Sequence, residues 1–83
     1  MANNSKQISH TYYVECAIQP YFQRVNVEAV SMQNALYMFL SRILGNGVKF
    51  RVEPRRGEHD ANMRLTKVDG VRHTKKYYKV FVG

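Results

Sequence analysis

The 83-residue sequence contains no tryptophan, one cysteine and only two prolines. A single cysteine, Cys16, permits neither a disulfide framework nor a cluster of thiolate metal ligands. No apolar run approaches the roughly 18 residues that cross a bilayer, and the polar opening of the chain predicts no signal segment. We therefore expect a chain without a membrane partner that works in a reducing, cytoplasmic compartment.

The chain is also short. Eighty-three residues make one domain with a thin core. A hydrophobic content of 45% excludes intrinsic disorder. The predicted organisation is a flexible tail at 1–9 followed by a single basic domain at 10–83. Because so small a core gives a narrow margin of stability, a homodimer or docking on a partner is a reasonable expectation.

Acidic residues are few. The sequence has 13 lysines and arginines against 6 aspartates and glutamates, for a net charge of +7. Residues 1–41 sum to zero, so the whole excess lies in residues 42–83. A one-sided positive field attracts phosphate backbones or acidic protein surfaces. The alternative is a basic face that only keeps the chain soluble, and the asymmetry favours binding over it.

Apolar residues recur with two different periods. Alternation with a period of two predicts strands, whereas spacing by three and four residues predicts one helix. Ser31 is expected to cap this helix and Gly45 to end it. The predicted elements are strands at 11–18 and 22–30, a helix at 32–44, a strand at 48–53, an exposed loop at 54–62, and strands at 63–68 and 71–82.

These elements predict an α+β fold in which a single helix packs on one face of an antiparallel sheet of four to five strands, in ββαββ or ββαβββ order. Asp69 and Gly70 predict a two-residue type I′ turn that sets Val68 opposite Val71. The last strand is long enough to pair on both sides. The order of the strands in the sheet stays open at this point.

Residue types that carry catalysis converge at one place only, at Glu58, His59 and Asp60. Sequence neighbours on a loop are poorly placed to converge as a general base or a metal site requires, so we expect a solvated polar loop. The three histidines and Cys16 lack metal-ligand spacing. The glycines at 45 and 47 follow the helix, whereas a phosphate loop precedes one. We therefore predict no enzyme, no catalytic residue, no metal and no cofactor.

Basic side chains and tyrosines mix along the predicted strands of the second half. Lysine and arginine meet phosphates while rings stack on bases, so this mixture suits single-stranded nucleic acid. Lysine-rich strand edges also protect against edge-to-edge aggregation. The outer side of the helix is a second surface, where Tyr37 beside Met38 is typical of a protein-binding face. A single exposed methionine is equally typical of an ordinary surface. The candidate binding residues are Tyr37, Lys49, Arg51, Arg55, Arg56, Arg64, Lys67, Arg72, Lys75, Lys76, Tyr77 and Lys79.

Part of the chain resembles small phage-encoded accessory proteins. The segment 25–31, with Ala35 in the helix and the segment 50–53, is similar to their strand–helix–strand core. Some anti-CRISPR proteins share this layout, and their later Lys-x-Asp-Gly hairpin resembles residues 67–70. The resemblance covers about half the chain, and the loop at 54–62 is longer than in that pattern. It implies a non-catalytic inhibitor with Tyr37, Lys49, Arg51, Arg64 and Lys67 as contacts.

Two binding hypotheses follow. The first is an anti-CRISPR-like inhibitor from a phage or mobile element that docks through its basic surface on a host protein or nucleoprotein complex. The alternative is a protein that binds DNA or RNA directly and largely without sequence preference, such as a ribosome-associated protein. No signature of sequence-specific reading is present.

Overall fold

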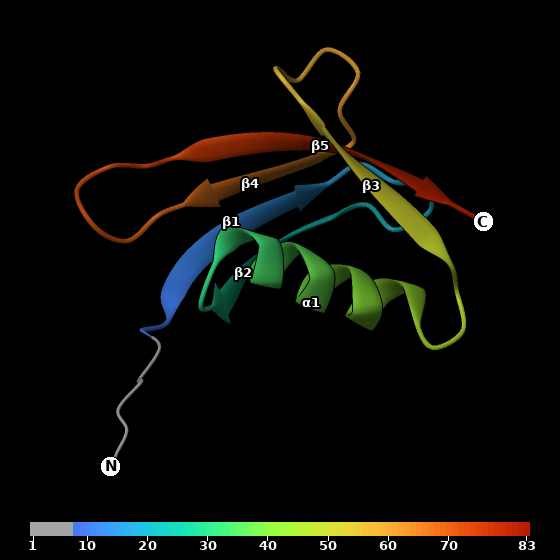
Figure 1. Ribbon diagram of the computed structural model, residues 1–83, viewed down its shortest axis with the longest axis horizontal. Helices are drawn as coiled ribbons and strands as arrows, with labels where there is room; N and C mark the ends of the chain where they lie inside the picture. The colour runs from blue at the N-terminus through green and yellow to red at the C-terminus, as the bar shows by residue number, and fades with distance from the viewer. Residues whose placement is uncertain (1–7) are drawn as a thin grey trace.

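The computed structural model describes residues 8–83, and most of the predicted tail, residues 1–7, lies outside them. The elements are β1 (His10–Cys16), β2 (Gln23–Ala29), α1 (Met32–Leu44), β3 (Phe50–Arg55), β4 (Met63–Lys67) and β5 (Lys75–Val82). The strands form one antiparallel sheet in the order β2-β1-β4-β5-β3, and α1 lies along one side of it (Figure 1). The predicted α+β class is confirmed, in its ββαβββ order.

The helix begins and ends where the sequence predicts. The Ser31 side-chain oxygen accepts a hydrogen bond from the Asn34 amide at 3.0 Å, and Gly45 ends the helix with a φ of 83°. Leu36 and Phe39 are buried, and α1 packs against β2, β1 and β4. In the part of the chain that the structure describes, no helix is long and apolar enough to cross a membrane.

The core lies between α1 and the sheet. Val14, Met63 and Leu65 are almost wholly buried there, and each contributes roughly 1.5–3 kcal/mol through the apolar surface that it removes from water. Because side chains alternate along a strand, the neighbours Glu15 and Arg64 point to the opposite side of the sheet. We call that side, which faces away from α1, the open face.

Strand β5 pairs with β4 on one side and with β3 on the other, as its length predicts. Beyond the start of β4, the Asn62 side chain continues the pairing. Its Nδ2 donates to the Val80 carbonyl at 3.0 Å, and its Oδ1 accepts from the Val80 amide at 2.8 Å. The backbone carbonyl of Asn62 also accepts a hydrogen bond from the Ala17 amide at 2.8 Å. Asn62 therefore joins the ends of β1, β4 and β5.

The predicted two-residue hairpin at Asp69 and Gly70 is wrong. Strand β4 ends at Lys67 and β5 begins at Lys75, so the connection spans residues 68–74 and Val68 does not pair with Val71. Residues 68 and 69 attach to β1 instead. The Val68 amide donates to the Thr11 carbonyl at 3.0 Å, and Asp69 pairs with Nδ1 of His10 at 3.1 Å. These contacts hold the start of the connection away from a tight turn.

Strand β3 is displaced along the chain from its predicted position. Pro54 and Arg55, predicted as loop, belong to β3 and lie opposite Tyr78 and Tyr77. Val48, predicted to face inward on the strand, precedes it and is exposed. Strand β3 lies at the edge of the sheet and pairs only with β5, and proline is tolerated in edge strands. The sequence-based prediction ended the strand before Pro54 because it did not allow for an edge position.

Candidate functional site

One row of side chains crosses the whole open face. In register, Arg24 of β2 lies opposite Glu15 of β1, Glu15 opposite Arg64 of β4, Arg64 opposite Tyr77 of β5, and Tyr77 opposite Arg55 of β3. The row contains three arginines, one carboxylate and one ring. It brings together residues up to 62 positions apart, from Glu15 to Tyr77, by strand pairing alone.

Arg64 is the residue of this row that contacts two carboxylates. Its Nε donates to the Glu15 carboxylate, and its Nη1 lies 3.5 Å from the carboxylate of Glu58 in the β3–β4 loop. The hydrogen bond from Arg64 lowers the pKa of Glu15, although partial burial acts the other way. The same bond raises the pKa of Arg64. Both groups are therefore charged at neutral pH, and the guanidinium plane is held on two sides.

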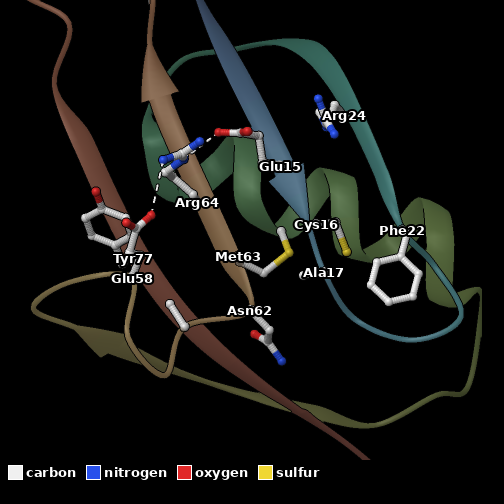
Figure 2. Close-up of a pocket in the computed structure, with 11 residues that line it drawn as sticks. Glu15, Cys16, Ala17, Phe22, Arg24, Glu58, Asn62, Met63, Arg64 and Tyr77 are labelled. Carbon is white, nitrogen blue, oxygen red and sulfur yellow. Dashed lines mark hydrogen bonds and ion pairs between the residues drawn. The ribbon is translucent and has the colours of Figure 1, made fainter.

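A groove of about 500 Å³ opens beside Arg64, and Figure 2 shows the side chains that surround it. We call it the polar groove. The β1 and β2 side contributes Glu15, Cys16, Ala17, Phe22 and Arg24. The opposite side contributes Glu58, Ala61, Asn62, Met63, Arg64 and Tyr77.

The polar groove has an apolar part and a charged part. Figure 2 shows Phe22 at one end and Tyr77 at the other, with the sulfurs of Cys16 and Met63 between them. Phe22 leaves the β1–β2 connection with 60% of its surface exposed. Sequence reasoning missed Phe22 as a site residue. Phe22 was predicted as the first residue of the second strand, whereas β2 begins at Gln23 and leaves Phe22 in the connection.

A second hollow, of about 300 Å³, lies between the end of β3 and the start of β5. We call it the basic cleft. Its lining residues are Pro54, Arg55, Arg56, Lys75, Lys76, Tyr77 and Tyr78. Five of the twelve predicted binding residues therefore meet here. Among the described residues, those that line this cleft include no carboxylate.

The cations of the basic cleft differ in how far they are neutralised. Arg55 pairs with Glu53 at 3.2 Å and with Asp60 at 3.1 Å. Arg56, Lys75 and Lys76 form no ion pair with any residue between 8 and 83. The cleft therefore holds one arginine in a fixed position beside three cations whose charge is available to a ligand.

The other predicted binding residues are spread over the molecule. Lys79 lies on the open face opposite Glu53, and Arg51 covers the Phe81 ring at 4.4 Å. Lys67 ends β4, and Arg72 lies in the connection 68–74 rather than on the last strand, where the sequence predicted it.

Tyr37 lies on α1, away from the open face. Its ring contacts that of Phe50 with the centroids 5.8 Å apart, and Lys49 precedes Phe50 outside β3. Tyr37 is 40% exposed. Burial, and then the nearby Tyr37, raise the pKa of Tyr78, so this lining residue of the basic cleft stays neutral. The helix surface thus adjoins the basic cleft at Tyr78, although no residue of α1 lines the cleft.

The residue types of the predicted polar loop do not converge. Glu58 pairs with Arg64 and Asp60 with Arg55, so the two carboxylates belong to different arginines. Among residues 8–83, no three histidine, cysteine, aspartate or glutamate side chains come together to hold a metal ion. Burial raises the pKa of the Cys16 thiol, which is therefore protonated at neutral pH and a poor nucleophile.

Comparison with known proteins adds no relative. No protein-family model, no curated protein and no solved structure matches the chain. Function is therefore inferred from the polar groove and the basic cleft.

Proposed function

We propose that the protein is a non-catalytic, cytoplasmic nucleic-acid-binding protein that holds the phosphate backbone of a strand in the basic cleft. The observation that carries the proposal is the lining of this cleft, where two strands bring four cations and two tyrosines together without a carboxylate. Phosphates are bound by lysine and arginine from the surface of a sheet, while neighbouring rings stack on bases.

The arrangement of charge supports this assignment. Arg56, Lys75 and Lys76 lack intramolecular partners within residues 8–83, so binding a phosphate breaks no ion pair at these positions. Arg55 is fixed by Glu53 and Asp60 and offers its plane in a set orientation. Neutralising phosphates releases counterions, which makes this kind of binding steeply dependent on salt.

A titration tests the proposal. A fluorescently labelled single strand of about 12 nucleotides, as DNA and as RNA, is titrated with the protein and followed by anisotropy. The three cations without intramolecular partners predict a slope of about −2 for log K against log salt, or a fall of roughly twentyfold between about 50 and 200 mM. Affinity that does not change with salt, or no binding at the lower concentration, contradicts the proposal.

A second candidate function is docking on a host nucleic-acid-handling complex as an anti-CRISPR-like inhibitor. The side chains exposed on the helix side of the molecule favour it. Tyr37, Val48 and Val82 are exposed around the half-buried Phe50, which lies opposite Val82 in the sheet. Lys49 adjoins this group. An exposed ring and aliphatic side chains beside a cation are typical of a protein-binding surface.

A pull-down from host lysate tests the docking candidate. It predicts a stoichiometric partner that Tyr37→Ala releases and Lys76→Ala retains. The absence of a stoichiometric partner, or a partner that only the lysine variant releases, counts against docking through the helix side.

A further inference from the structure

The polar groove is chemically unlike the basic cleft, although Tyr77 lines both. The cleft is lined by cations and tyrosines. The groove adds two carboxylates, Glu15 and Glu58, and the exposed apolar ring of Phe22. Arg24 and Arg64 balance these two carboxylates, so the groove has no excess positive charge to attract a phosphate and suits a different part of a nucleic acid.

We propose that the polar groove binds one unpaired nucleobase of the strand whose phosphates occupy the basic cleft. This inference rests on the proposed function. A base is flat, uncharged and apolar on its faces, and it carries hydrogen-bond donors and acceptors at its edge. The groove offers matching features, with aromatic rings at its ends and charged hydrogen-bonding groups beside them (Figure 2).

Phe22 is the first reason for this assignment. It is 60% exposed, and it lines the groove at the end opposite Tyr77. Keeping an aromatic side chain in water forgoes the stabilisation that its burial would give to a chain with so small a core. A base that stacks on this ring covers the exposed surface, and every base has a face that can do so.

The charged wall is the second reason. Arg64 is held by Glu15 and, at 3.5 Å, by Glu58, so its guanidinium plane is fixed before any ligand arrives. A fixed guanidinium plane can stack on a base or donate to its edge. Glu58 is 78% exposed along its side chain and can accept from the amino and imino groups of a base.

Asn62 supplies rigidity rather than recognition. Both ends of its amide are used by the backbone of Val80, at 3.0 and 2.8 Å. The backbone carbonyl of Asn62 accepts a hydrogen bond from the amide of Ala17, another lining residue. The part of the groove between β1 and β4 is therefore built on anchored backbone, whereas Phe22 and Glu58 enter it from loops. Selection of single strands over duplexes follows, because a paired base cannot enter.

The test compares two strands that share the same phosphates. A labelled single strand and an abasic strand of equal length are titrated at low salt. We expect the base-containing strand to bind roughly tenfold more tightly than the abasic strand, which is the effect of one stacked base. A duplex of the same sequence has all its bases paired, so stacking of a base in the groove should add nothing to its affinity.

Phe22→Ala should reduce this difference to the part that stacking on Tyr77 and Tyr78 contributes, and it should leave affinity for the abasic strand unchanged. Phe22 is largely exposed, so the variant is expected to fold. Tyr37→Ala removes an aromatic side chain on the helix and should retain the full difference. Lys76→Ala should weaken both strands by the same factor. A strand that carries 2-aminopurine gives a readout without any variant, since its fluorescence falls when the base stacks on a ring.

The outcomes separate the two proposals. Equal affinity of the parent protein for the base-containing and abasic strands overturns the base site and leaves phosphate binding standing. A difference that Phe22→Ala leaves undiminished also overturns the assignment to this groove, as does unquenched 2-aminopurine in a saturated complex. Failure to bind either strand overturns the phosphate cleft itself, and the base site with it.

Discussion

Tyr77 lies directly opposite Arg64 in the register of β4 and β5, and it lines both the basic cleft and the polar groove. On its other side, Tyr77 lies opposite Arg55 of β3. Each of the two arginines is held by carboxylates, so the ring has a fixed cation on either side. Because Tyr77 belongs to both hollows, variants of other residues are needed to distinguish phosphate binding from base binding.

Removing one unpaired cation from the basic cleft should weaken binding to a single strand and make its affinity less dependent on salt. Lys76→Ala is expected to reduce the magnitude of the salt slope by about 0.7, the contribution of one phosphate contact on a single strand. Arg42→Ala removes the same charge from the last turn of α1 and should leave the slope nearly unchanged. Anisotropy titrations over a range of salt concentrations measure both slopes. Equal changes for the two variants would mean that only the net charge matters.

The ion pair between Glu15 and Arg64 should make stability depend on pH. The hydrogen bond from Arg64 lowers the pKa of Glu15 in the folded protein. Such a carboxylate stabilises the fold above its unfolded pKa, and this stabilisation is lost as the pH falls through the folded value. Glu15→Gln should therefore lower the free energy of unfolding by about 1 kcal/mol at neutral pH and by less below roughly pH 4.

Urea unfolding at both pH values checks this expectation. Glu58→Gln is the matched control, because its carboxylate is far more exposed and lies farther from Arg64, so its effect should stay within about 0.5 kcal/mol. A deficit in Glu15→Gln that is the same at neutral and acidic pH would contradict the electrostatic origin.

Asn62→Ala should destabilise the sheet. The substitution leaves the amide and the carbonyl of the buried residue Val80 without their side-chain partners, at a cost of about 1–3 kcal/mol. Asn62→Asp should also destabilise, since a carboxylate cannot donate to the Val80 carbonyl. Asn26→Ala, on the exposed outer side of β2, is the control with little effect. Denaturant titration measures all three, and an unchanged Asn62→Asp would disprove the donor role.

Leu65→Ala tests the position of the core. Leu65 is fully buried between β4 and α1, so the cavity that its truncation leaves should cost about 2–5 kcal/mol. Met38→Ala, on the exposed side of the same helix, should change the free energy of unfolding by less than about 0.5 kcal/mol. Similar losses for the two variants would place the core elsewhere.

Local patterns were sufficient to predict the helix, its caps and the buried faces of the first two strands, because each depends on residues close together in the chain. The connection 68–74 could not be predicted in this way. Its first residues are held by Thr11 and His10, contacts with β1 that no property of Asp69 and Gly70 encodes.

The candidate site also combines features that local sequence predicts with features that depend on long-range contacts. The tyrosine and the cations of the basic cleft were predicted as binding residues, but their meeting depends on β3 pairing with β5, which the sequence left open. Glu15, Phe22 and Asn62 were not predicted, since their roles arise from partners on other strands. Long-range pairing supplies what residue types alone do not.

Mapping the complex on the labelled protein shows whether the strand lies in the basic cleft. Amide chemical shifts of the protein are recorded by NMR while an unlabelled single strand of about 12 nucleotides is added at low salt. We predict that the largest changes fall at Arg55, Arg56 and residues 75–78 of the basic cleft, and that those along α1 are smaller. Changes that centre on α1, or a spectrum that the strand leaves unaltered, would contradict it.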